Sequence, residues 1–226
     1  MIYNKLKDYL SEDRLKPYLN KTKYDIKKAI GLYKLNLEYS SQLYKVLSLF
    51  EVFLRNSINN QLSIINTNWI IKLNNLHIQI LHNVLNTSTA TEKTVQTFKE
   101  IFSIQENLIE NVSDDLKLDK KPITNNNMVS RLTFGFWTRL FNKTYEDMLW
   151  KKYLHKVFSV KLTRKKVEHT LNEFRWLRNR IAHNEPILYM KHTPQDYYKR
   201  VIEFIELIDN DLAKFAKKTV SQDLFD

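Results

Sequence analysis

Cysteine is absent from this chain of 226 residues, and glycine occurs only twice, at Gly31 and Gly135. Without cysteine there is no disulfide framework and no thiolate zinc site. Two isolated glycines exclude a glycine-rich phosphate loop and a dinucleotide-binding fingerprint, and neither a His-Glu-x-x-His pair nor a Gly-x-Ser-x-Gly elbow occurs. With only four prolines, the chain also has few turn residues for a β architecture. These absences agree with a helical protein, and they exclude a thiolate zinc site and the common glycine-rich nucleotide sites.

Long apolar runs are missing as well, so the sequence predicts no transmembrane helix and no membrane contact. The first residues, Met1-Ile2-Tyr3-Asn4-Lys5, lack the apolar core of a signal peptide. We therefore expect a soluble, cytoplasmic protein. Its length is sufficient for a sizeable core, in one large domain or two small ones.

Positive charge is in excess, with 36 Lys and Arg residues against 25 Asp and Glu residues and a formal net charge of +11. Such an excess favours a polyanionic partner, with RNA or DNA first and an anionic membrane surface second. Many intracellular proteins are basic for no specific reason, so charge alone does not decide the function. No convincing helix-turn-helix signal is present, which places RNA ahead of DNA.

Hydrophobic periodicity predicts helices almost throughout. The expected helices are Ile2–Leu10, a short one near Pro17, Ile26–Asn36, one from Tyr39 or Ser40 to Ile65, Leu76–Leu85, Glu92–Val112, Met128–Phe141, Thr144–Val157, Arg164–His183 and Pro194–Lys217. Gly135 either permits close packing inside its helix or breaks that helix into two. Residues 113–127, with a proline and an Asn triplet, are the best candidate for a linker between subdomains. We nevertheless expect one domain over residues 1–226.

The most informative stretch is residues 175–186, RWLRNRIAHNEP. It contains an Arg-Asn pair, three further residues, a His and, soon after, a Pro. Because Pro186 cannot continue a helix, His183 is expected in the last turn of one. At 100° per residue, Asn179 and His183 lie one turn apart on the polar face. An imidazole at a helix end, with an arginine and an amide one turn back, is suited to chemistry on a phosphodiester.

Two apolar stripes predict a shared core, and each contains a charged residue. The stripe of the motif helix is Val167, Leu171, Phe174, Leu177 and Ile181, and that of an earlier helix is Leu43, Leu47, Phe50, Leu54, Ile58 and Leu62. Arg178 falls within the first stripe and Glu51 within the second, with Arg55 at its edge. A buried charge is costly unless it is paired, so the pattern favours a Glu51–Arg178 ion pair. The alternative is that both side chains reach solvent at the edge of their faces.

Three segments resemble the Abi-like (abortive infection, AbiD/AbiF-type) branch of the HEPN superfamily. Residues 50–56, FEVFLRN, are similar to that branch's Glu-and-Arg-Asn helix, and residues 132–137, LTFGFW, to its mid-chain Phe-Gly segment. Residues 178–183 match its Arg-x4-His motif. The resemblance implies an all-α, compact helical bundle of HEPN type with additional N-terminal and middle helices. It also implies a metal-independent endoribonuclease that acts as a homodimer in phage defence or in a toxin–antitoxin system.

These observations define a candidate site. The catalytic candidates are Arg178, Asn179 and His183, the supporting ones are Glu51, Arg55 and Asn56, and the RNA-binding ones are Arg175, Arg180, Lys166 and Trp176. In attack by the RNA 2′-hydroxyl on the adjacent phosphate, His183 can serve as base or acid. Arg178 or Arg180 can stabilise the charged transition state, and Asn179 can orient the imidazole or a phosphate oxygen. Trp176 can stack on a base.

Weaker alternatives stay open at this point. On spacing alone, Arg178 would be only a core ion pair and His183 only a helix cap. A non-catalytic RNA-binding regulatory module with a degenerate site is the alternative function. We expect RNA as substrate, and restraint of the activity by an acidic protein or a folded RNA. The resemblance favours a small-RNA antitoxin, since some members of the resembled group are encoded beside small RNAs. The remaining histidines, which are His77, His82, His155, His169 and His192, are expected to be ordinary surface or boundary residues.

Overall fold

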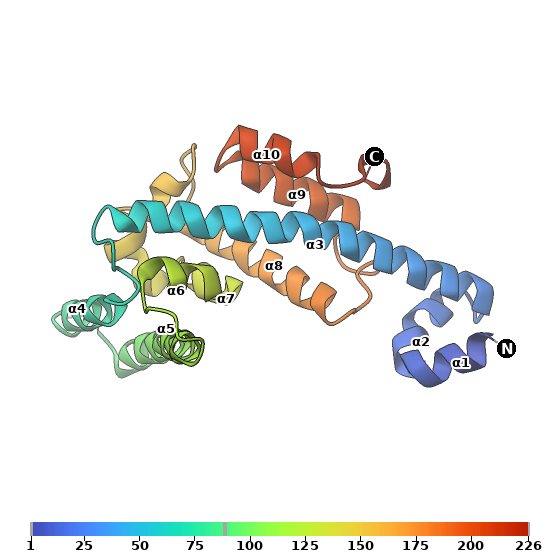
Figure 1. Cartoon of the computed structure of the whole chain (residues 1–226), viewed down its shortest axis with the longest axis horizontal. Helices are drawn as coiled ribbons and strands as arrows, with labels where there is room; N and C mark the ends of the chain where they lie inside the picture. The colour runs from blue at the N-terminus through green and yellow to red at the C-terminus, as the bar shows by residue number, and fades with distance from the viewer. Residues whose placement is uncertain (1, 88–89, 226) are drawn as a thin grey trace. The chain divides into compact units, whose positions relative to one another are not determined.

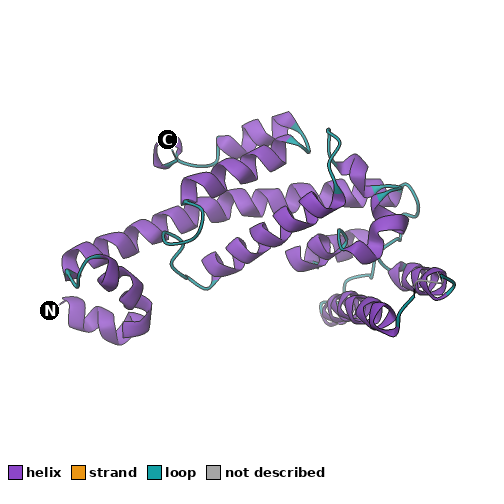
Figure 2. Cartoon of the chain, turned by 180° about the vertical axis from the view of Figure 1, so that it is seen from behind, coloured by secondary structure: helices purple, strands orange, loops and turns teal. Residues whose placement is uncertain are grey.

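A computed structural model describes residues 2–87 and 90–225, and every regular element in these ranges is helical (Figure 1, Figure 2). The main helices are α1 (Ile2–Leu10), α2 (Glu12–Lys21), α3 (Ile26–Ser63), α4 (Leu73–Leu85), α5 (Glu92–Leu118), α6 (Asn125–Arg131), α7 (Phe134–Arg139), α8 (Arg164–Ala182), α9 (Pro194–Glu206) and α10 (Asn210–Lys217). Short turns of helix are η1 (Lys143–Tyr145), η2 (Glu146–Trp150), η3 (Leu154–Val157) and η4 (Gln222–Leu224). The all-α prediction is confirmed.

The chain divides into two compact units. Unit 1 is built from residues 1–50, 176–206 and 210–226, and unit 2 from residues 51–175 and 207–209. Both α3 and α8 supply residues to each unit, since the divisions fall at residues 50/51 and 175/176. The segment expected to be a linker, residues 113–127, lies inside unit 2.

Both predicted apolar stripes are buried. The stripe residues of α3 from Leu43 to Leu62 are at most 1% exposed, and those of α8 from Val167 to Ile181 are at most 6% exposed. Each such side chain contributes roughly 1.5–3 kcal/mol when it leaves water. Period-3.6 patterning therefore identified the core faces of these two helices correctly.

In unit 1, helices α9 and α10 lie side by side (Figure 1). The rings of Phe50 on α3 and Phe204 on α9 meet edge to face, with centroids 6.1 Å apart. A second cluster joins the N-terminal helices to the chain that follows α8, since Tyr18 of α2 contacts the ring of Tyr189 at 5.7 Å. Tyr33 of α3 completes this cluster at 5.5 Å from Tyr18.

In unit 2, helices α4 and α5 lie side by side (Figure 1), and a buried histidine joins them. His77 of α4 is 1% exposed and stacks on Phe102 of α5, with centroids 4.1 Å apart and planes 6° from parallel. Its Nδ1 lies 2.7 Å from Glu106 Oε1 and its Nε2 lies 2.9 Å from the Tyr145 hydroxyl. The prediction of a surface or boundary role was therefore wrong for His77, because these partners satisfy both ring nitrogens inside the core.

The other four histidines agree with that prediction. His82, His155 and His169 are exposed, and His192 is half-buried. Trp137 and Trp150 are buried.

The buried imidazole makes the stability of the protein sensitive to acid. Burial lowers the pKa of His77 below its ordinary value of 6.5, and the hydrogen bond that its Nδ1–H donates to the Glu106 carboxylate only partly opposes this. Because the folded-state pKa lies below the unfolded one, the unfolded chain binds the proton more readily, and stability declines as the pH falls below 6.5. We expect His77→Gln to flatten the dependence of melting temperature on pH between about pH 7 and pH 5.5. An equally steep dependence in the variant would contradict this.

Several helix boundaries differ from the sequence prediction. The expected break between Asn36 and Tyr39 is absent, and α3 runs without interruption to Ser63. Asn36 does not end the helix, because its side chain bonds to backbone far away in the sequence instead of competing with its own helix. The predicted end of α5 at Val112 is also wrong. The Ser113 hydroxyl donates to the Ile109 carbonyl, and the helix continues to Leu118.

Three further segments are more divided than predicted. The expected helix 128–141 is interrupted at Leu132 and Thr133, whose backbones are extended, and Gly135 lies just after that break in α7. The expected helix 144–157 consists of the short turns η1, η2 and η3. The expected helix 194–217 divides into α9 and α10 at residues 207–209. Among the described residues, every helix is too short or too polar to cross a lipid bilayer.

Candidate functional site

The end of α8 positions the motif. Asn184 has a left-handed backbone with φ of 53°, and its N–H donates to the Ile181 carbonyl at 2.9 Å. The N–H of Glu185 donates to the Arg180 carbonyl, also at 2.9 Å. These two bonds form a Schellman motif, in which asparagine takes the place that glycine usually occupies. His183 is therefore the cap residue that follows α8, one position beyond the last turn in which the sequence placed it.

Exposure separates the three catalytic candidates. Arg178 is half-buried at the edge of the apolar stripe, whereas Asn179 and His183 are exposed. The N–H of His183 donates to the Asn179 carbonyl at 3.0 Å, so the two side chains lie one helical turn apart. Within the described part of unit 1, Arg178 forms no ion pair. An imidazole and an amide thus face solvent, and the half-buried guanidinium of Arg178 lies on the same stretch of α8 without an ion pair from the described part of unit 1.

Arg180 has a different environment. Its Nη2 lies 2.7 Å from Glu185 Oε2 and its Nε 2.8 Å from the same oxygen. The guanidinium also lies over the ring of Trp176, 4.6 Å from the centroid, in a cation–π contact. Trp176 itself is 47% exposed. The charge of Arg180 is therefore largely offset by Glu185, while the ring of Trp176 keeps an accessible area.

Two residues that the sequence did not single out hold the segment after the motif. Asn36 is fully buried, and its Oδ1 accepts hydrogen bonds from the N–H groups of Ile187 at 2.7 Å and Leu188 at 3.3 Å. Its Nδ2 donates to the Glu185 carbonyl at 3.3 Å. The signal was available, because Asn36 is a polar residue at a core position of α3, two helical turns before Leu43.

Arg14 of α2 is the other such residue. Its Nη1 lies 3.4 Å from the carbonyl oxygens of His183 and Asn184. A cation at this place is favoured by the partial negative charge of the helix C-terminus. Nothing near Arg14 in the sequence indicates this role.

The remaining predicted site residues lie in unit 2. Arg55 is half-buried and donates from Nη1 to the Ser130 carbonyl at 3.5 Å, while Glu51 is half-buried and Asn56 is exposed. Lys166 is exposed and Arg175 is half-buried. Within unit 1, the end of α8 carries Trp176, Arg178, Asn179, Arg180 and His183. The Glu51–Arg178 pair would join residues of different units, and it stays a prediction.

The comparisons with known proteins identify the family. The family model described as Abi-like protein matches residues 2–189, which include all of the motif. Comparison with curated proteins and with solved structures gives no match.

Proposed function

Because the chain belongs to the Abi-like protein family, we propose that it is a metal-independent endoribonuclease of abortive infection, acting in phage defence or as the toxin of a toxin–antitoxin system. One observation carries the proposal. The exposed His183 caps α8 one turn after the exposed Asn179, and Arg178 stands five positions before it in the Arg-x4-His spacing. A catalytic group needs such access to its substrate, whereas a purely structural cap does not.

The chemistry follows from the side chains at this helix end. The RNA 2′-hydroxyl attacks the neighbouring phosphate, a base takes its proton, and an acid protonates the leaving 5′-oxygen. His183 is assigned one of these proton transfers. Arg178 is favoured over Arg180 for stabilising the phosphorane, because Glu185 already offsets the charge of Arg180. Asn179 is assigned the orientation of the imidazole or of a phosphate oxygen.

The reaction needs two proton transfers, and one motif supplies one histidine. We therefore propose a homodimer in which His183 of each copy faces a common cleft. Light scattering is expected to give twice the chain mass of 27.2 kDa at the concentrations used for cleavage assays. A monomer that still cleaves RNA would refute the shared cleft.

The activity is tested by incubating the purified protein with end-labelled RNA in EDTA. Cleavage is expected to persist in the chelator and to leave 2′,3′-cyclic phosphate ends, because the attacking group is the RNA's own hydroxyl. Absence of cleavage, or products with 3′-hydroxyl ends, would count against the proposed reaction.

RNA binding without cleavage is the second candidate function. It is favoured by Trp176, whose exposed ring, backed by Arg180, is suited to stacking on an unpaired base. A small RNA antitoxin would also use such a surface. A gel shift in the same assay, with no product, would favour this second function.

A further inference from the structure

Two arginines converge on a small pocket in unit 2. Its volume is about 170 Å³, and its polar lining consists of Thr138, Arg139, Asn142, Glu168, Asn172 and Arg175. Arg139 comes from α7 and Arg175 from α8. Both approach Gly135, since a Cβ built on that residue would lie 3.1 Å from Arg139 Nη1 and 3.9 Å from Arg175 Cδ. The glycine of the Phe-Gly segment thus leaves space for the Arg139 guanidinium.

The two guanidinium groups lack compensating charge. Among the described residues, neither Arg139 nor Arg175 forms an ion pair or a side-chain hydrogen bond. Burial, and after it the positive charge of Arg175, lowers the pKa of Arg139. An arginine nevertheless stays protonated at neutral pH, so the fold holds two like charges close together in a half-buried place. Such an arrangement is unfavourable without an anion between them.

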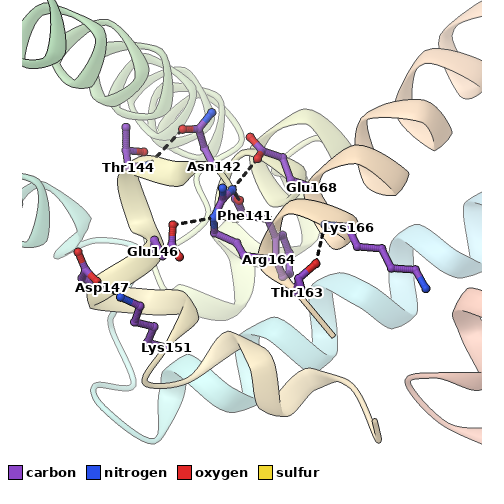
Figure 3. Close-up of polar contacts among 10 residues, drawn as sticks. All are labelled: Phe141, Asn142, Thr144, Glu146, Asp147, Lys151, Thr163, Arg164, Lys166 and Glu168. Atoms are coloured by element: carbon purple, nitrogen blue, oxygen red, sulfur yellow. Dashed lines mark hydrogen bonds and ion pairs between the residues drawn. The ribbon is translucent and has the colours of Figure 1, made fainter. Parts of the chain in front are cut away.

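The acidic residue of the pocket is already engaged. Glu168 accepts a hydrogen bond from Arg164 at 2.5 Å, and the same guanidinium lies 3.2 Å from Glu146 and donates to the Phe141 carbonyl at 2.7 Å (Figure 3). The side chain of Arg164 is only 10% exposed. Arg164, Arg139 and Arg175 together carry three positive charges, and Glu146 and Glu168 carry two negative ones. An excess of positive charge therefore remains beside the pocket.

The other polar groups are mainly donors. Asn142 Oδ1 accepts from the Thr144 N–H at 3.2 Å, which leaves its NH₂ group available (Figure 3). Asn172 is exposed on α8. The volume is below the roughly 300–1,000 Å³ of pockets that enclose whole small molecules. It is sufficient for one compact anionic group, and planar guanidinium donors are matched to phosphate oxygens.

We propose that this pocket binds a phosphate group, and that the group belongs to an RNA chain. The phosphate site itself stands on the geometry of unit 2 alone. The choice of RNA over a free nucleotide or inorganic phosphate rests on the proposed function.

The test uses the full chain with His183→Ala as parent, so that RNA is bound and not cleaved. Arg139→Gln and Arg175→Gln are each expected to weaken binding of a fluorescent single-stranded RNA about tenfold, as a charge-assisted hydrogen bond is lost. The slope of log affinity against log salt should also become shallower by about one. Lys151→Gln is the matched control, because it removes one positive charge from an exposed ion pair with Asp147 outside the pocket (Figure 3).

Gly135→Ala tests whether RNA binding depends on the shape of the pocket or only on the positive charge of the protein surface. The added Cβ displaces the flexible end of Arg139 but alters no charge, and the backbone of Gly135 does not require glycine. We expect RNA binding to weaken here too, with little change in the salt slope. A melting curve of each variant checks that it is folded.

Inorganic phosphate tests whether the pocket binds a phosphate group that is not part of an RNA chain. Phosphate stabilises most proteins because it is excluded from their surface. The informative measurement is therefore the difference between two rises in melting temperature on adding phosphate, that of the parent and that of Arg139→Gln, at equal ionic strength. An excess rise together with lost RNA affinity supports the proposal. An excess rise with unchanged RNA affinity keeps the phosphate site but rejects RNA as its source. Equal affinity and equal melting behaviour in parent and Arg139→Gln would overturn the proposal, and none of these results depends on whether the motif cleaves RNA.

Discussion

RNA cleavage is expected to fall at least about 100-fold when His183 is replaced by alanine, because a positioned acid or base typically contributes about 10²–10⁴ to the rate. The imidazole is exposed at the end of α8, so its removal should leave the fold intact. The measurement is the single-turnover rate on labelled RNA, combined with a melting curve of each protein.

The matched control is His169→Ala. His169 is also an exposed histidine of α8, but it lies outside the motif. Its replacement should change neither cleavage nor stability. Cleavage by purified His183→Ala at the wild-type rate would remove the basis of the catalytic assignment. A loss of cleavage that is accompanied by unfolding would instead give His183 a structural role.

Replacing Arg164 by alanine is expected to lower the free energy of unfolding by about 3–5 kcal/mol, the usual result of removing one member of a buried ion pair. The guanidinium contacts Glu146, Glu168 and the Phe141 carbonyl, and its side chain is 10% exposed (Figure 3). Without it, two partly buried carboxylates lose their shared counter-charge. Chemical denaturation, followed by circular dichroism, measures the change.

The control for this experiment is the replacement of Lys151, which is also drawn in Figure 3. Lys151 and Asp147 form an ion pair of similar length, but their side chains are 61% and 80% exposed. Solvent and salt weaken such a pair, so Lys151→Ala should not change stability measurably. If Arg164→Ala were as stable as Lys151→Ala, the buried cluster would not contribute to the fold.

The sequence predicted those features that depend on neighbouring residues. The stripes of α3 and α8 follow from helical periodicity, and the end of α8 near His183 follows from Pro186. The contacts of Asn36 with residues 185–188 were not predictable in this way, because they join segments far apart in the chain. For the same reason, the continuity of α3 through Asn36 was missed. The burial of His77 depends on Glu106 and Tyr145, which lie on other elements.

In the candidate site, too, the sequence predicted the local features and missed the contacts between more distant residues. Exposure of Asn179 and His183 was predicted from their place opposite the apolar stripe. The pairing of Arg180 with Glu185 was not, because they lie five positions apart and the left-handed turn at Asn184 brings them together. Arg139 was missed because no local pattern connects it with Arg175.

Unit 1 consists of segments that are separated in the chain, so the ribosome synthesises them at different times. Residues 1–50 emerge before unit 2, but their partners from residue 176 onward emerge only after residues 51–175 have been synthesised. Asn36 must wait for Ile187, 151 positions later. The support around His183 therefore forms only after residues 51–175 have been translated, and a product that stops within residues 51–175 contains no motif at all.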